Sequence, residues 1–90
     1  MFRVWGKTIK NNKTTADHVA CIEDYTLNRT KKVYMALEEI CNKLDMAVPI
    51  WLDLNKKEFI CHAKTRFTQD SFIETIEFDY LEFQVIEEDY

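Results

Sequence analysis

Glycine and proline are nearly absent from this 90-residue chain, which contains one of each, Gly6 and Pro49. Barrels and sandwiches with many strands need turn residues at short intervals, so their scarcity argues against an all-β architecture. It also excludes the glycine-rich loops that bind phosphates in P-loop and dinucleotide-binding proteins. We therefore expect no nucleotide cofactor.

Long apolar runs and a paired set of cysteines are missing as well. No apolar stretch approaches the roughly 18 to 20 residues that span a bilayer, and residues 1–7 lack the apolar region and cleavage site of a secretory signal. Three cysteines, Cys21, Cys41 and Cys61, match neither a disulfide framework nor a metal motif. These absences predict a cytoplasmic protein with reduced thiols and no membrane contact.

Apolar and charged residues are plentiful, but the charge is unevenly distributed. An apolar share of 47% is enough for one packed domain over residues 1–90. Residues 1–32 contain seven bases and three acids, whereas residues 68–90 contain eight acids and no base. The simplest explanation is a basic first strand that pairs with an acidic last strand; the alternative is an acidic surface for a partner.

Residues 30–45 have the spacing of an amphipathic helix. Their apolar side chains recur every three or four residues, which places them on one face, and Asn28 or Thr30 can cap the first turn. That face must pack on a sheet, so we expect Leu37→Asp to abolish folding. The apolar stripe consists of Val33, Leu37, Ile40, Cys41 and Leu44.

Apolar and acidic residues alternate through the last predicted strand, residues 74–87. This period of two is typical of a strand with one buried and one solvated face. The apolar parity changes where Tyr80 and Leu81 are adjacent. A bulge near 79–81 would return both halves to the same face; the alternative is a strand covered on both sides. Because this strand is the longest and most apolar, we expect it at the sheet centre.

The region between the main helix and the last strand is more ambiguous. Residues 50–54 are predicted as a short strand or a buried connector. Residues 55–64 resemble a short helix with Asn55 as its cap, although their apolar spacing also fits a strand. We expect irregular structure at 65–72.

The first residues predict a hairpin, which completes the fold. Residues 2–10 and 18–25 read as two antiparallel strands joined by a polar loop at 11–16. The sequence therefore predicts an α+β domain in the order β-β-α-β-α-β. It would have a small, largely antiparallel sheet with the main helix on one face.

Cys61 and His62 invite a catalytic interpretation, but neighbours in sequence point about 100° apart on a helix and to opposite faces of a strand. They cannot form a thiolate–imidazole pair with each other, so an enzyme using either would need a distant partner such as His18. His18 and Cys21 have the spacing of a zinc-ligand pair, but residues three apart on a strand face opposite sides of the sheet, which argues against a zinc site there. We expect no catalytic, metal-binding or cofactor-binding residues.

The acidic residues do not form an obvious catalytic pair either. Glu74, Glu77, Asp79 and Glu82 follow the pattern of a solvated strand face, whereas a glycosidase needs one buried and one ionised carboxylate. Asp53, among apolar neighbours, is the acid that we expect to be partly buried. A turn or cap role suits it better than that of a base.

Arg3, Trp5 and Lys7 share one face of the first predicted strand. Basic residues interleaved with an aromatic can bind single-stranded nucleic acid, but the acidic C-terminal segment repels phosphate. The structural alternative places Trp5 in the core, with the stems of Arg3 and Lys7 around it.

Three segments, residues 36–41, 49–53 and 64–82, resemble small uncharacterised proteins of anaerobic Gram-positive bacteria. That family has no assigned activity, so the resemblance implies only a bacterial cytoplasmic setting and a self-contained domain. We expect a non-enzymatic domain that binds another protein or a second copy of itself as a homodimer. The alternatives are a thiol- or histidine-dependent enzyme using Cys61 or His62, and a nucleic-acid binder.

Overall fold

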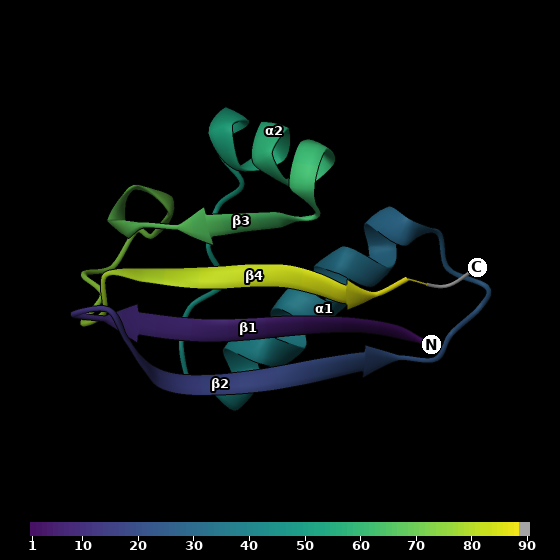
Figure 1. Ribbon diagram of the computed structural model, residues 1–90, viewed down its shortest axis with the longest axis horizontal. Helices are drawn as coiled ribbons and strands as arrows, with labels where there is room; N and C mark the ends of the chain where they lie inside the picture. The colour runs from purple at the N-terminus through teal and green to yellow at the C-terminus, as the bar shows by residue number, and fades with distance from the viewer. Residues whose placement is uncertain (89–90) are drawn as a thin grey trace.

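The computed structural model describes residues 1–88 and has the predicted α+β class, with a four-stranded antiparallel sheet and two α-helices (Figure 1). The strands lie in the order β2-β1-β4-β3, so the last strand is central, as predicted. Asp89 and Tyr90, the end of the acidic segment, lie outside the described residues. The elements are β1 (Phe2–Lys10), β2 (Lys13–Ile22), α1 (Arg29–Lys43), α2 (Asp53–His62), β3 (Lys64–Phe67), the 3-10 turn η1 (Gln69–Ser71) and β4 (Tyr80–Glu87).

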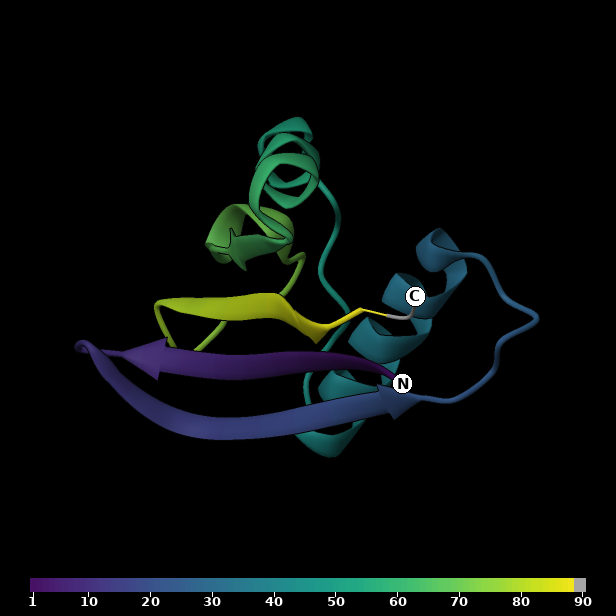
Figure 2. The ribbon, with the colours of Figure 1, turned by 45° about the vertical axis from the view of Figure 1, so that its right-hand side comes forward.

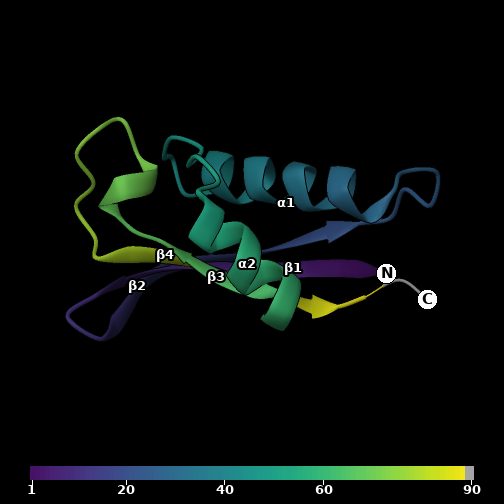
Figure 3. The same ribbon diagram turned by 90° about the horizontal axis from the view of Figure 1, so that it is seen from above.

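Helix α1 covers one face of the sheet, and α2 lies beside β3 at its edge (Figures 2 and 3). Asn28 caps α1, because its side chain accepts a hydrogen bond of 2.9 Å from the backbone N–H of Lys31. The predicted stripe faces the sheet, with Leu37 and Ile40 buried and Leu44 partly buried. No helix within residues 1–88 has the length and apolar content to cross a bilayer.

The charge asymmetry of the sequence corresponds to the pairing of β1 with β4. Arg3 Nε lies 3.3 Å from Glu87 Oε1, and Lys7 Nζ lies 3.3 Å from Glu82 Oε2. Both pairs join a basic residue of the first strand to an acid of the last, as predicted. Cross-strand pairs of this kind stabilise a sheet by roughly 0.2–1 kcal/mol each.

The β1–β2 hairpin is longer than predicted. Asn11 and Asn12 both have positive φ, 53° and 65°, which is the backbone of a tight two-residue hairpin turn. Lys10 therefore pairs directly with Lys13, and β2 covers Lys13–Ile22 instead of 18–25. The predicted loop at 11–16 was wrong because asparagine can replace glycine in left-handed backbone.

The last strand is shorter than predicted and begins at Tyr80 instead of residue 74. Its neighbour β1 pairs with it only as far as Ile9, opposite Tyr80, so residues 72–79 have no strand beside them and form a loop. The side chain of Gln69 holds this loop by donating to the carbonyl of Glu74 (2.8 Å) and accepting from the N–H of Ile76 (2.9 Å). The change of parity marks the start of β4, and the predicted bulge at 79–81 was wrong.

The strand alternative for 50–54 was also wrong. The fourth strand, β3, follows α2 at residues 64–67 and forms the start of the segment 65–72 that was predicted to be irregular. The order is therefore β-β-α-α-β-β. Residues 50–52 form a connector, but Ile50 and Leu52 are exposed and not buried as that alternative had it. Helix α2 begins at Asp53, which confirms a second helix. Asn55 is not its cap: its Oδ1 accepts from the N–H of Leu52 (3.0 Å), and its amide donates to Thr65 Oγ1 (2.9 Å). This buried amide therefore connects α2 to β3.

Candidate functional site

The residues considered for thiol or metal chemistry lie apart. Cys61 and His62 are exposed near the end of α2, and within residues 1–88 neither forms a hydrogen bond with another side chain. His18 instead pairs with α1, because its Nε2 lies 2.8 Å from Glu39 Oε2. Burial raises the pKa of Cys41 to about 12, so this thiol is no nucleophile at neutral pH. No group of three potential metal ligands occurs in the described part of the chain.

The acidic residues are arranged differently from the prediction. Asp53 is exposed in the first turn of α2, whereas Glu82 is buried among three cations. Its carboxylate lies 3.3 Å from Lys7 Nζ, 3.1 Å from Lys64 Nζ and 3.5 Å from Arg66 Nε. Burial acts to raise the pKa of Glu82, but hydrogen bonds and charge from Lys64 and Lys7 outweigh it, so this pKa is lowered. Glu82 is thus an ionised structural group.

The sheet face opposite α1 contains Trp5, which is half-buried and does not belong to the core. Lys7 Nζ lies 4.1 Å from the centre of the Trp5 ring, and the indole N–H donates to Asp17 Oδ2 at 3.0 Å. Arg66 lies similarly over Tyr80, at 4.8 Å. Both aromatic rings therefore already have a cation against them. The prediction that Lys7 lies against Trp5 was confirmed. The prediction that Trp5 belongs to the core was wrong.

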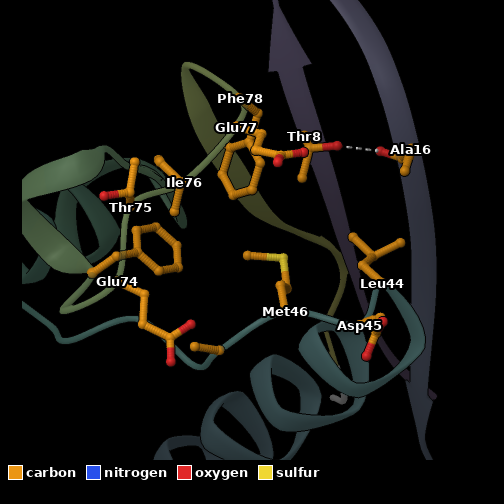
Figure 4. A pocket seen from close by; sticks show the side chains of 12 residues that line it. Thr8, Ala16, Leu44, Asp45, Met46, Glu74, Thr75, Ile76, Glu77 and Phe78 are labelled. Carbon is orange, nitrogen blue, oxygen red and sulfur yellow. Dashed lines mark hydrogen bonds between the residues drawn. The ribbon is translucent and has the colours of Figure 1, made fainter.

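A pocket of about 330 Å³ lies between the end of α1, the β1–β2 hairpin and the loop 72–79. Figure 4 shows Met46 and Ile76 in its apolar middle, with Asp45, Glu74 and Glu77 at separate points of its wall. The three carboxylates do not converge on one point, and they do not form a metal site. This pocket therefore shows no convergent chemistry.

A second hollow, of about 240 Å³, lies between the two helices, and we call it the interhelical groove. Thr30 and Tyr34 of α1 are one turn apart, as are Lys56 and Ile60 of α2, so each helix contributes one ridge. Tyr34 is 50% exposed and Ile60 is 83% exposed, although both are large apolar residues. The groove is lined by Arg29, Thr30, Val33, Tyr34, Trp51, Lys56, Phe59 and Ile60.

Trp51, in the connector between the helices, forms part of the groove and holds its walls together. Its ring meets Tyr34 of α1 at 6.2 Å and Phe59 of α2 at 5.4 Å, both edge to face. It also packs against Phe67 and Phe83 of the sheet, at 4.9 and 6.0 Å. Aromatic pairs of this geometry add about 0.5–1.5 kcal/mol each beyond burial. The groove is therefore built on a rigid aromatic base.

The surroundings of the groove are basic. Lys56 lines it together with Arg29, whose guanidinium pairs with Glu88 at 2.9 Å. Lys31 and Lys57 are exposed on the same two helices. Within residues 1–88, Lys31, Lys56 and Lys57 form no ion pair. An apolar hollow with unpaired cations on its helices favours a ligand that combines apolar and acidic groups.

Comparison with protein-family models, curated proteins and solved structures gave no match for this chain. The interhelical groove was not predicted from the sequence. Its one local signal is Ile60, an apolar residue next to the core residue Phe59 and therefore on a different face of α2. Tyr34 lies near the Ile60 face of α2 because Trp51 packs against both helices. A local sequence pattern does not reveal this packing.

Proposed function

We propose that this chain is a small bacterial cytoplasmic domain without enzymatic activity that binds a protein segment in the interhelical groove. The segment would be amphipathic, with apolar side chains entering between Tyr34 and Ile60 and acidic side chains facing Lys56 and Lys57. Recognition of an amphipathic segment by an apolar groove is a recurring mode of protein binding.

The exposure of Ile60 beside this groove is the observation that carries the proposal. A side chain that is 83% exposed contributes little to the fold, whereas large apolar groups at the edge of a hollow mark binding surfaces. The base made by Trp51 and Phe59 is preformed. A ligand would therefore spend little free energy on ordering the site.

A library of random peptides, selected on the immobilised chain, provides the test. We expect enriched peptides to combine acids with apolar residues spaced three or four apart, and titration with a synthetic peptide to shift the signals of Tyr34, Trp51 and Ile60. Ile60→Asp should weaken binding by at least about tenfold, as removal of a central apolar anchor does.

Leu54→Asp is the matched control, because Leu54 is 67% exposed on the same helix and does not line the groove. It should bind the peptide as the unmodified chain does. Equal binding by the Ile60→Asp variant would place the peptide elsewhere. Selection that yields no binding peptide would count against a role in protein recognition.

Nucleic-acid binding is the second candidate, and the cations around Glu82 favour it. Lys7, Lys64 and Arg66 share the Glu82 carboxylate. With Arg3 beside Glu87 and Asp17 beside Trp5 on the same face, cations outnumber carboxylates there only slightly. A single-stranded oligonucleotide should then bind at low salt and quench Trp5. Absence of quenching at low salt would dismiss this function. The thiol enzyme has less support, because Cys61 has no imidazole partner among the described residues.

A further inference from the structure

Ile73 is the most exposed large apolar side chain in the described part of the protein, at 91%. It lies in the loop 72–79, which connects η1 to β4. Asp70, Glu74 and Glu77 surround it in the sequence, and none of the three forms an ion pair within residues 1–88. The loop thus presents one aliphatic side chain among unneutralised carboxylates.

This loop is held in shape by the rest of the protein. The Gln69 side chain bonds to the backbone of Glu74 and Ile76. Phe72 and Phe78 pack edge to face at 5.8 Å, which joins the two ends of the loop. Ile73 is therefore displayed on a braced support, and binding through it would require little ordering of the backbone.

The loop and the interhelical groove have complementary chemistry. The loop offers an aliphatic group flanked by acids, and the groove offers an apolar hollow of about 240 Å³ with unpaired lysines on its helices. The loop lies at the end of the sheet away from the first turn of α1 (Figures 1 and 3). A braced loop at that position cannot enter the groove of its own chain.

We infer that a second copy of this chain occupies the interhelical groove, with Ile73 inserted beside Ile60 and Tyr34 and the acidic residues of the loop facing Lys56 and Lys57. This inference rests on the proposed function of the groove as a protein-binding site. The contact joins two different surfaces. Two copies form a closed pair if both contacts fit at once, and otherwise the chains associate head to tail.

Sedimentation equilibrium over micromolar to millimolar concentration provides the test. The mass of the unmodified protein should rise with concentration, and added salt should weaken the association because the contact pairs acids with lysines. Ile73→Asp and Ile60→Asp should each lower the association constant by at least about tenfold. Leu54→Asp, the matched control on α2, should associate normally.

An equal mixture of the two defective variants gives the most specific result. The Ile73→Asp chain retains its groove and the Ile60→Asp chain retains its loop, so the mixture should form a one-to-one pair that neither variant forms alone. Both substitutions are at exposed positions, and unchanged circular dichroism and melting temperature would show that both variants fold. A mixture that stays monomeric overturns the inference.

Cys61 allows a direct check, because it is exposed and adjacent to Ile60. A Cys21→Ser chain carrying a spin label at Cys61 should broaden the signals of residues 72–77 in an unlabelled copy. A protein that is monomeric at every concentration also overturns the inference. If peptides still bind such a monomer and Ile60→Asp abolishes their binding, the proposed function stands without self-association.

Discussion

Gly6 of strand β1 packs directly against Ile40 of helix α1. A β-carbon at residue 6 would lie 2.5 Å from Cγ2 and 2.9 Å from Cδ1 of Ile40, whereas carbon atoms pack best at about 3.5–4.0 Å. Ile40 is fully buried, so its side chain has little free space to move into. Gly6→Ala should therefore force the helix and the sheet apart.

The expected cost follows from two opposing effects. Overpacking of a core costs about 1–3 kcal/mol. The backbone at Gly6 does not have positive φ, so alanine causes no local strain and would by itself gain about 0.5–1 kcal/mol over glycine in a strand. We expect a net loss of up to about 2.5 kcal/mol. A domain of this size has a total stability of roughly 5–13 kcal/mol, so the variant should still fold.

A double-mutant cycle with Ile40→Ala tests whether the clash is the cause. Ile40→Ala alone leaves a cavity and should cost about 2–5 kcal/mol. In the double variant the new methyl group at residue 6 fills part of that cavity, so the combined loss should be at least about 1 kcal/mol smaller than the sum. Urea unfolding followed by circular dichroism measures each free energy from the midpoint and slope.

Val33→Ala is the matched control, because Val33 is a buried residue of the same helix. The atoms nearest to a β-carbon at residue 6 all belong to Ile40 and none to Val33. Its effect should add to that of Gly6→Ala within about 0.5 kcal/mol. The reasoning would be refuted if Ile40→Ala were equally additive. A Gly6→Ala variant more stable than the unmodified protein would contradict it as well.

Three further predictions concern polar groups and thiols. Ionised Glu82 has a lowered pKa, so its stabilising contribution is present above the ordinary value of 4.5 and is lost as the pH falls through the lowered one. Glu82→Gln should lower the free energy of unfolding by about 1–3 kcal/mol at pH 7. It should also weaken the pH dependence of that free energy below pH 4.5, as measured by urea unfolding; an unchanged pH dependence in this range would contradict the reasoning. Asn55→Ala should lower stability by about 2–4 kcal/mol in the same assay, because buried backbone groups lose their partners, and a loss near zero would show that water replaces the amide. In alkylation followed by mass spectrometry, Cys21 and Cys61 should react in the folded protein and Cys41 only after unfolding, and rapid reaction of Cys41 would argue against its burial.

Helix α1 was predicted within two residues at each end, because every determinant of it is local. The cap at Asn28 and the stripe that includes Leu37 and Ile40 lie within one short segment. Residues 74–79 show the opposite case. Their alternation is that of a strand, but a strand also needs a neighbour for its backbone hydrogen bonds, and β1 turns away at Asn11.

The candidate site depends even more on contacts distant in sequence. Tyr34 and Ile60 have no relation that a local pattern could reveal, and Trp51 brings their helices together by packing between them. Glu82 was predicted to face water for a similar reason. Its position in the alternation was read correctly as outward, but Lys64 and Arg66 come from β3, whose pairing with β4 could not be recognised from four residues.

The amino-acid order alone determined the α+β class, the main helix, the central place of the last strand and the pairing of a basic strand with an acidic one. All of these follow from periodicity and charge within single segments. Only the tertiary structure decided where strands end, which carboxylate is buried and where the two helices leave a groove. The physical reason is that hydrogen-bond partners, desolvation and side-chain packing depend on residues far apart in the chain, which local patterns do not specify.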